Sequence, residues 1–138
     1  MIDKDITETL LTAAQKVKNR AYAPYSHYQV GAALLTKSGQ IYVGCNIENA
    51  SYGATNCAER TALFSAIASG EKDFEAIALV GGYENQIDGH IVPCGICCQA
   101  LSEFCDKDFL IIIKNEESYR TIKLQDLFPY AFSSQNLK

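Results

Sequence analysis

Long apolar runs and clusters of basic residues are both missing from this sequence. Because no apolar stretch is long enough to cross a bilayer, neither a membrane-spanning protein nor a membrane partner is expected. Lysine and arginine are scattered and the net charge is −4, so a surface that neutralises nucleic-acid phosphates is not expected either. Residues 1–5 are polar and acidic, unlike a signal or transit peptide, and we therefore expect a cytoplasmic protein.

The composition suits one compact unit. A chain of 138 residues with 48% hydrophobic residues can fill one core. No repeat, linker or low-complexity stretch interrupts it, so we expect a single domain over residues 1–138. Six cysteines could form three disulfides, but that framework is typical of small secreted domains with poor cores. Metal binding or free thiols are favoured instead.

Hydrophobic periodicity predicts an alternation of helices and strands. The first helix is expected to begin with Asp5 as the capping residue and Glu8 three positions later, and to end before Pro24. Strands are expected over residues 28–36, 41–45, 76–81, 109–114 and 119–123, and further helices over 57–68, 95–105 and 124–127. Strand–helix–strand connections through the middle favour parallel pairing there. The pattern predicts an α/β three-layer sandwich, with a mixed five-stranded sheet and helices on both faces.

Three cysteines and one glutamate form the densest group of reactive side chains. They lie in Cys57-Ala58-Glu59 and in the stretch from Pro93 through Cys94 to Cys97. Zinc prefers four tetrahedral ligands, so three thiolates would leave one position for water, as in catalytic sites. A carboxylate two residues from a ligand is well placed to move protons on and off that water. The alternative, a structural zinc module, would need a fourth protein ligand such as Cys98 or His90.

Two electrostatic features would support such a site. The cysteines fall at the starts of two predicted helices, where the partial positive charge of the helix N-terminus lowers the pKa of a thiol. Three thiolates and Zn²⁺ sum to a charge of −1, which weakens the ion as a Lewis acid. Arg60 is the candidate cation to donate hydrogen bonds to the thiolates; the alternative is an ordinary solvent-exposed helix arginine.

The paired cysteine motifs resemble the zinc deaminase signature, and most closely the small homotetrameric cytidine deaminases. The resemblance spans nearly the whole chain. Its further blocks are Ala21-Tyr22-Ala23-Pro24-Tyr25-Ser26, Gln29-Val30-Gly31-Ala32-Ala33, Gly44-Cys45-Asn46-Ile47-Glu48-Asn49-Ala50, Cys57-Ala58-Glu59-Arg60-Thr61-Ala62 and Ala131-Phe132.

The resemblance implies a reaction and a cofactor. It implies one zinc ion per subunit, held by Cys57, Cys94 and Cys97, with Glu59 as the proton shuttle. The implied activity is hydrolytic deamination of cytidine and 2'-deoxycytidine to uridine and 2'-deoxyuridine, in pyrimidine salvage. A nucleic-acid editing deaminase would share the zinc site but would show a basic or aromatic surface for a strand. A deaminase for a modified cytosine nucleoside antibiotic is the closest competing function.

The resemblance also implies substrate contacts and an assembly, a homotetramer with shared active sites. The Ala58 N–H would meet the base O2, and Asn46 with Glu48 would hold the ribose hydroxyls. Tyr28 stands where the family usually has Phe packing on the base or sugar; its added hydroxyl needs a partner or water. Tyr52 and Phe132 stand where neighbouring subunits complete each other's pockets.

One departure from the family concerns the charge near the thiolates. Cys98 stands where the family commonly carries Arg, and Gln99, expected close to the zinc ligands, follows it. We therefore predict that Arg60 alone offsets the thiolate charge. Cys98 is also an alternative to Cys97 as the third ligand, although the spacing favours Cys97.

Overall fold

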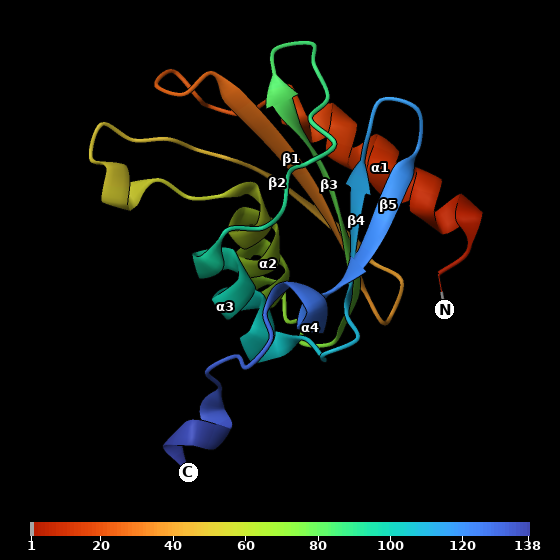
Figure 1. The fold of residues 1–138 in the computed structure, drawn as a ribbon, viewed down its shortest axis with the longest axis vertical. Coiled ribbons are helices and arrows are strands. Elements are labelled where there is room, and N and C mark those ends of the chain that lie inside the picture. Colours follow the sequence, from red (N-terminus) through yellow and green to blue (C-terminus); the bar gives the residue numbers. More distant parts are fainter. Residues whose placement is uncertain (1) are drawn as a thin grey trace.

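The computed structural model describes residues 2–138 as a five-stranded sheet covered by helices on both faces (Figure 1). The strands stand in the order β2-β1-β3-β4-β5. Only β3 and β4 pair in parallel, and the other neighbours are antiparallel. The strands are β1 (Tyr28–Thr36), β2 (Ile41–Cys45), β3 (Phe74–Tyr83), β4 (Leu110–Lys114) and β5 (Tyr119–Lys123). The mixed sheet expected from the sequence is thus confirmed.

The helices divide between the two faces of the sheet. Helix α1 (Lys4–Lys18) covers one face, and α2 (Ala58–Ala68), α3 (Gly95–Phe104) and α4 (Leu124–Leu127) cover the other (Figure 1). Successive strand side chains point to opposite faces. Ala33 and Leu35 of β1 accordingly pack with the α1 cluster, whereas Ala32 and Leu34 pack with the cluster on the α2 and α3 side. The result is a three-layer sandwich.

Helix α1 differs from the prediction at its N-terminus. Its N-cap is Asp3 rather than Asp5, because Asp3 has extended backbone and its Oδ1 accepts a hydrogen bond from the Ile6 N–H at 2.8 Å. Asp5 lies in the first turn, where the positive end of the helix dipole stabilises a carboxylate. The helix ends at Lys18, before Pro24 as the sequence predicts.

The other elements follow the prediction, with differences at their ends. Strand β3 extends beyond residues 76–81, because the long β1 pairs with its flanks. Helix α2 begins at Ala58, with Cys57 as its N-cap, and α3 ends at Phe104. Two short 3-10 helices were not predicted, at Tyr52–Ala54 and Ser134–Leu137. Within residues 2–138, no helix combines the length and apolar character needed to span a membrane.

A glycine at the end of β2 allows α2 to approach the sheet closely. A Cβ on Gly44 would lie 2.4 Å from the backbone N of Ala62 and 2.7 Å from the carbonyl O of Ala58. Any larger residue would push the helix away from the strand. Because α2 starts directly after Cys57, this contact fixes how deeply the start of α2 sits against the sheet.

Candidate active site

The structure brings three thiols together at the starts of two helices. The Sγ atoms of Cys57, Cys94 and Cys97 all lie within 4.8 Å of one another, and those of Cys57 and Cys94 are 3.8 Å apart. Cys57 and Cys94 are the N-caps of α2 and α3, and Cys97 lies in the first turn of α3. Zn–S bonds of about 2.3 Å at tetrahedral angles require sulfurs about 3.8 Å apart. The three thiols therefore fit one zinc ion.

The alternative protein ligands lie outside this group. Across residues 2–138, the cluster able to hold a metal contains neither Cys98 nor His90. The buried Cys98 instead donates its thiol hydrogen to the Pro93 carbonyl at 3.6 Å, and burial raises its pKa. The geometry thus favours Cys97 over Cys98, and it offers three protein ligands, as in zinc sites that keep a position open for water.

The thiols of Cys57 and Cys97 shift each other's pKa values. A hydrogen bond from Cys97, assisted by Arg60, lowers the pKa of Cys57 to about 5 although burial opposes this. The same hydrogen bond, with burial, raises the pKa of Cys97, which keeps its proton and donates it. Cysteine binds zinc as the thiolate, so the interactions that lower the pKa of Cys57 favour the form that binds a metal ion.

Arg60 lies beside these sulfurs. Its Nη2 donates a hydrogen bond to the Cys57 Sγ at 3.4 Å, and this interaction with the thiolate raises the arginine pKa. Its Nε is buried and has no hydrogen-bond partner within residues 2–138. The guanidinium is thus placed as a partner of the thiolates and not as a solvent-exposed helix charge.

Glu59 is a buried carboxyl group at the start of α2. Only 4% of the residue is exposed. Burial raises its pKa to about 7, and the nearby Cys57 charge adds to the effect. A general acid or base works best when its pKa lies near the working pH, and strongly perturbed carboxyls cluster at functional sites. Glu59 can therefore both accept and donate a proton near neutral pH.

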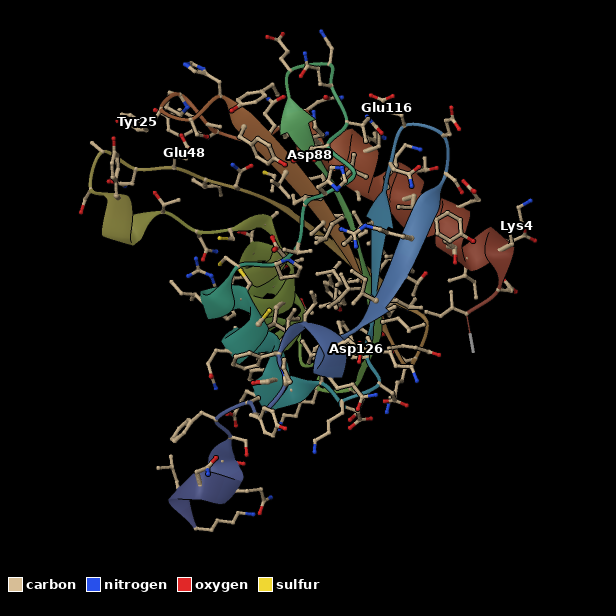
Figure 2. The ribbon with its side chains drawn as sticks, in the orientation of Figure 1. Lys4, Tyr25, Glu48, Asp88, Glu116 and Asp126 are labelled. Carbon is tan, nitrogen blue, oxygen red and sulfur yellow. The ribbon has the colours of Figure 1, made fainter. Side chains whose placement is uncertain are left out.

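The two residues expected to bind ribose also hold the backbone at the start of β1. Asn46 accepts from the Val30 N–H at 2.9 Å and donates to the Tyr28 carbonyl at 2.8 Å. Glu48 Oε1 accepts from two N–H groups, at 2.9 and 3.1 Å, and Oε2 accepts from the Ser26 hydroxyl. Figure 2 shows Glu48 beside the labelled Tyr25, one of the N–H donors.

The remaining candidate residues are spread around the site. Tyr28 is half-buried against the cluster on the α2 and α3 side, and Ala58 is buried at the first position of α2. The exposed fraction is 75% for Tyr52 and 56% for Phe132. Gln99, expected near the thiolates, donates its side-chain amide to the Phe132 carbonyl at 3.0 Å and ties the C-terminal segment to α3.

Sequence reasoning missed Asp88, which lies in a polar loop without a recognisable motif. The Tyr28 hydroxyl donates a hydrogen bond to its Oδ2 at 2.6 Å. The available signal was the hydroxyl of Tyr28 itself, which stands where the family usually has Phe and so requires a polar partner.

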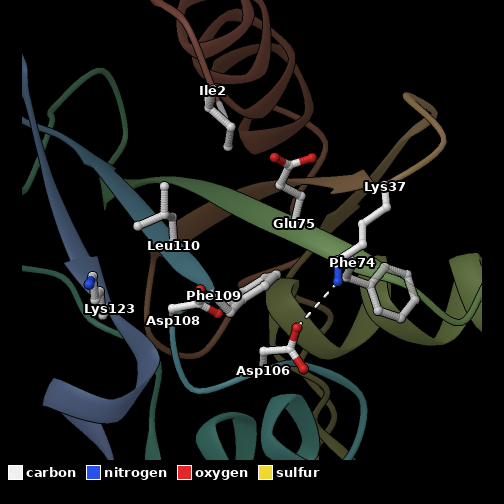
Figure 3. Close-up of a pocket in the computed structure, with 9 residues that line it drawn as sticks. All are labelled: Ile2, Lys37, Phe74, Glu75, Asp106, Asp108, Phe109, Leu110 and Lys123. Atoms are coloured by element: carbon white, nitrogen blue, oxygen red, sulfur yellow. Dashed lines mark hydrogen bonds and ion pairs between the residues drawn. The ribbon is translucent and has the colours of Figure 1, made fainter.

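A different pocket, of about 630 Å³, contains none of these groups (Figure 3). Its most prominent polar contact is the ion pair between Lys37 and Asp106, 3.2 Å long, with both side chains exposed. Exposed pairs of this kind contribute little stability. The pocket offers neither a metal-binding cluster nor a buried acid, and the chemistry lies at the cysteines.

Known proteins share both the sequence and the fold. The family model for the cytidine and deoxycytidylate deaminase zinc-binding region matches residues 4–113. A cytidine deaminase from Sporosarcina psychrophila is 43% identical over 131 residues, covering 94% of this chain and 93% of that protein. Blasticidin-S deaminase from Bacillus cereus is 32% identical over 136 residues, covering 96% of this chain and 95% of that protein.

Among solved structures, a crystal structure of cytidine deaminase from Burkholderia pseudomallei matches with a TM-score of 0.83 at 46% sequence identity. The match covers 91% of this chain and 98% of that chain. The α/β fold is therefore the one found in these enzymes. With the family model and the curated relatives agreeing over most of its length, the chain belongs to the cytidine and deoxycytidylate deaminase family of zinc-binding enzymes.

Proposed function

We propose that this protein hydrolyses cytidine and 2'-deoxycytidine to uridine and 2'-deoxyuridine, releasing ammonia. The observation that carries the proposal is the buried Glu59, two residues from Cys57 in a cluster of three thiols that fits zinc. Cys57, Cys94 and Cys97 would hold the ion, which, when bound, lowers the pKa of water so that hydroxide is available near neutral pH. The proposed setting is pyrimidine salvage in the cytoplasm.

Glu59 would move the protons of the reaction. It would accept a proton from the attacking water and deliver it to N3 of the cytosine ring. The second proton would go to the departing amine, so that water and cytidine give uridine and ammonia. Because burial raises the pKa of Glu59 to about 7, the carboxyl group could both accept a proton from water and donate one to the substrate near neutral pH.

The base would bind at the start of α2, the helix that carries the proposed zinc ligand Cys57 as its N-cap. The first N–H groups of a helix have no intrahelical partner, and Ala58 occupies the first position of α2. Its N–H would donate to the O2 of the base. Tyr28, on the same side of the sheet, would form the wall against the base or sugar.

The ribose contacts support activity on 2'-deoxycytidine as well as cytidine. A carboxylate offers about four acceptor positions, and Glu48 already uses three of them. Asn46 has one donor hydrogen left on Nδ2. The second lone pair of Asn46 Oδ1 is a further acceptor, so these groups could engage more than one hydroxyl, and the 3'-hydroxyl would keep partners when the 2'-hydroxyl is absent. The Glu48 charge would also repel a 5'-phosphate, which favours nucleosides over nucleotides.

The exposed aromatic residues support a homotetramer with shared active sites. Tyr52 and Phe132 are large apolar side chains with more than half of their surface exposed, and the C-terminal segment extends away from the sheet (Figure 1). We propose that neighbouring subunits cover them and complete the pockets. Dilution that dissociates the subunits should then remove activity; separated subunits with full activity would contradict sharing.

The deciding experiment is zinc-dependent conversion of cytidine to uridine, followed by absorbance. The Glu59→Gln protein is the control, because it keeps the shape of the side chain but cannot accept the proton. We expect Glu59→Gln to lower kcat about 10²–10⁴-fold while the zinc content stays the same. A folded, zinc-loaded protein without activity on cytidine would overturn the proposal.

A modified cytosine nucleoside is the second candidate substrate. The 32% identity to blasticidin-S deaminase from Bacillus cereus supports testing blasticidin S in the same assay. Conversion of blasticidin S without conversion of cytidine would replace the first candidate with the second.

A further inference from the structure

Asp88 holds the hydroxyl of Tyr28 across a long sequence separation. The Tyr28 hydroxyl donates to Asp88 Oδ2 at 2.6 Å, a hydrogen bond to a charged acceptor and therefore stronger than a neutral one. The other carboxylate oxygen accepts from the His90 N–H at 2.9 Å, and the Asp88 N–H donates to the Gly81 carbonyl at 2.6 Å. Both carboxylate oxygens and the backbone N–H of Asp88 thus have hydrogen-bond partners, which fixes the orientation of the carboxylate.

The loop that carries Asp88 is itself attached to the sheet. Arg120 of β5 donates from Nε to the Gly89 carbonyl at 3.1 Å and from Nη2 to the Ile91 carbonyl at 3.5 Å. Gly89 also packs closely on Asn115, since a Cβ there would lie 2.7 Å from the Asn115 Cβ. The anchored backbone runs on to Cys94. Asp88 is therefore an acceptor in an anchored segment that leads along the chain from β3 to the proposed zinc ligand Cys94.

The ring of Tyr28 is confined on its other sides. It makes an edge contact with the ring of Tyr83, with centroids 5.4 Å apart and an interplanar angle of 85°. Its Cε1 lies 3.5 Å from the position that a Cβ on Gly81 would occupy. The backbone N–H of Tyr28 donates to the Ser26 hydroxyl, which in turn donates to Glu48. The hydroxyl bond to Asp88 is the contact that fixes the far end of the ring.

We propose that Asp88 is a positioning residue for the nucleoside, acting through Tyr28. By holding the phenol hydroxyl, Asp88 fixes the plane of the ring that forms the wall against the base or sugar. A family Phe at this position would have no such bond, so the pair is a feature of this chain. The inference rests on the proposed function, because it assigns the Tyr28 ring to the nucleoside pocket.

The test is a double-mutant cycle on cytidine affinity. The dissociation constant is measured by calorimetry in a zinc-loaded Glu59→Gln background, where turnover is expected to be about 10²–10⁴-fold slower, for Asp88→Ala, Tyr28→Phe and both together. We expect each single change to weaken binding about tenfold, and the double change to weaken it no further. Asp88→Asn keeps an acceptor and should recover most of the affinity. Glu116→Ala removes an exposed carboxylate near Asp88 and is the matched control, expected to leave affinity unchanged.

The outcomes separate this inference from the proposed function. Unchanged affinity in Asp88→Ala, or effects that add fully in the double variant, would overturn the positioning role even if the wild-type protein deaminates cytidine. If the affinity effects are coupled in the Glu59→Gln background but the wild-type protein does not deaminate cytidine, the positioning role is upheld and the proposed function is overturned. Absence of cytidine binding to a folded, zinc-loaded Glu59→Gln protein would overturn both. Unfolding curves of each variant identify losses that come from folding alone.

Discussion

Arg60 donates its guanidinium hydrogen to the Sγ of Cys57 at 3.4 Å, from three positions further along the chain. Residues three apart lie on the same face of a helix, so the start of α2 brings a cation next to a thiolate. The chain has Cys98 where the family commonly supplies a further Arg. We therefore propose that Arg60 offsets the charge of the sulfurs.

Replacing Arg60 should weaken the site. We expect Arg60→Gln to reduce zinc affinity or activity about 10–100-fold, because groups that hydrogen bond to metal ligands have effects of this size. Zinc affinity would be measured by competition with a chelator, and activity with cytidine. Arg20→Gln, at an exposed position, is the control; equal losses in both variants would contradict a specific role for Arg60.

Cys97 and Cys98 should respond oppositely to substitution. We expect Cys97→Ala to lose bound zinc, because its Sγ belongs to the three-thiol cluster, and Cys98→Ala to retain it. Cys98→Arg should retain zinc and activity, since the position is not required for the ligand set. Zinc content by mass spectrometry under native conditions checks all three. A Cys98→Arg protein with intact zinc and no activity would refute the independence of Cys98.

The buried Glu59 should make the metal-free protein lose stability as pH rises. The pKa of Glu59 is about 7 in the folded protein, against a usual 4.5. As the pH rises between these values, the unfolded chain releases this proton while the folded chain keeps it, so the free energy of unfolding falls. Relative to Glu59→Gln, the wild-type protein should lose up to about 3 kcal/mol between pH 4.5 and 7. Urea unfolding after metal removal measures this; a constant difference across that range would contradict it.

Gly44 should tolerate no side chain. Gly44→Ala places a methyl group 2.4 Å from the Ala62 nitrogen, so we expect a loss of about 1–3 kcal/mol from overpacking. Gly53→Ala is the control, because its added methyl group meets nothing within 4 Å. Urea unfolding of both proteins decides. A Gly44→Ala protein as stable as the control would show that α2 can move away freely.

The order of elements was predictable because each has a local signal. Apolar periodicity and turn residues gave the bounds of β1, β2 and β5 as the structure has them. The length of β3 was not predictable in this way, because its ends are strand only through pairing, Tyr83 with Tyr28 and Phe74 with Thr36. The predicted N-cap of α1, Asp5, was wrong. Asp3 and Asp5 are equally good capping residues by type, and only the backbone geometry selects Asp3.

In the candidate site as well, residues in short motifs were predictable from the sequence, whereas contacts between distant segments were not. Spacing singled out the three cysteines that lie together in the structure, since metal ligation constrains residue type and position together, and the role of Glu59 in proton transfer stays a prediction. It could not show that Asn46 binds the backbone of β1 and Glu48 the backbone of the loop before it, because those partners lie about 20 positions away in sequence. Asp88 was hidden for the same reason, since its contact with Tyr28 spans 60 positions.

The sulfurs of Cys57 and Cys94 belong to segments 37 positions apart, with all of β3 between them. A metal ion shared by both segments acts as a cross-link that closes this loop, much as a disulfide would. The chain-entropy model assigns roughly 4 kcal/mol to closing a loop of that length. Loading with zinc would therefore tie the two helix starts together across the central strand, and its binding free energy would offset this cost and stabilise the folded chain.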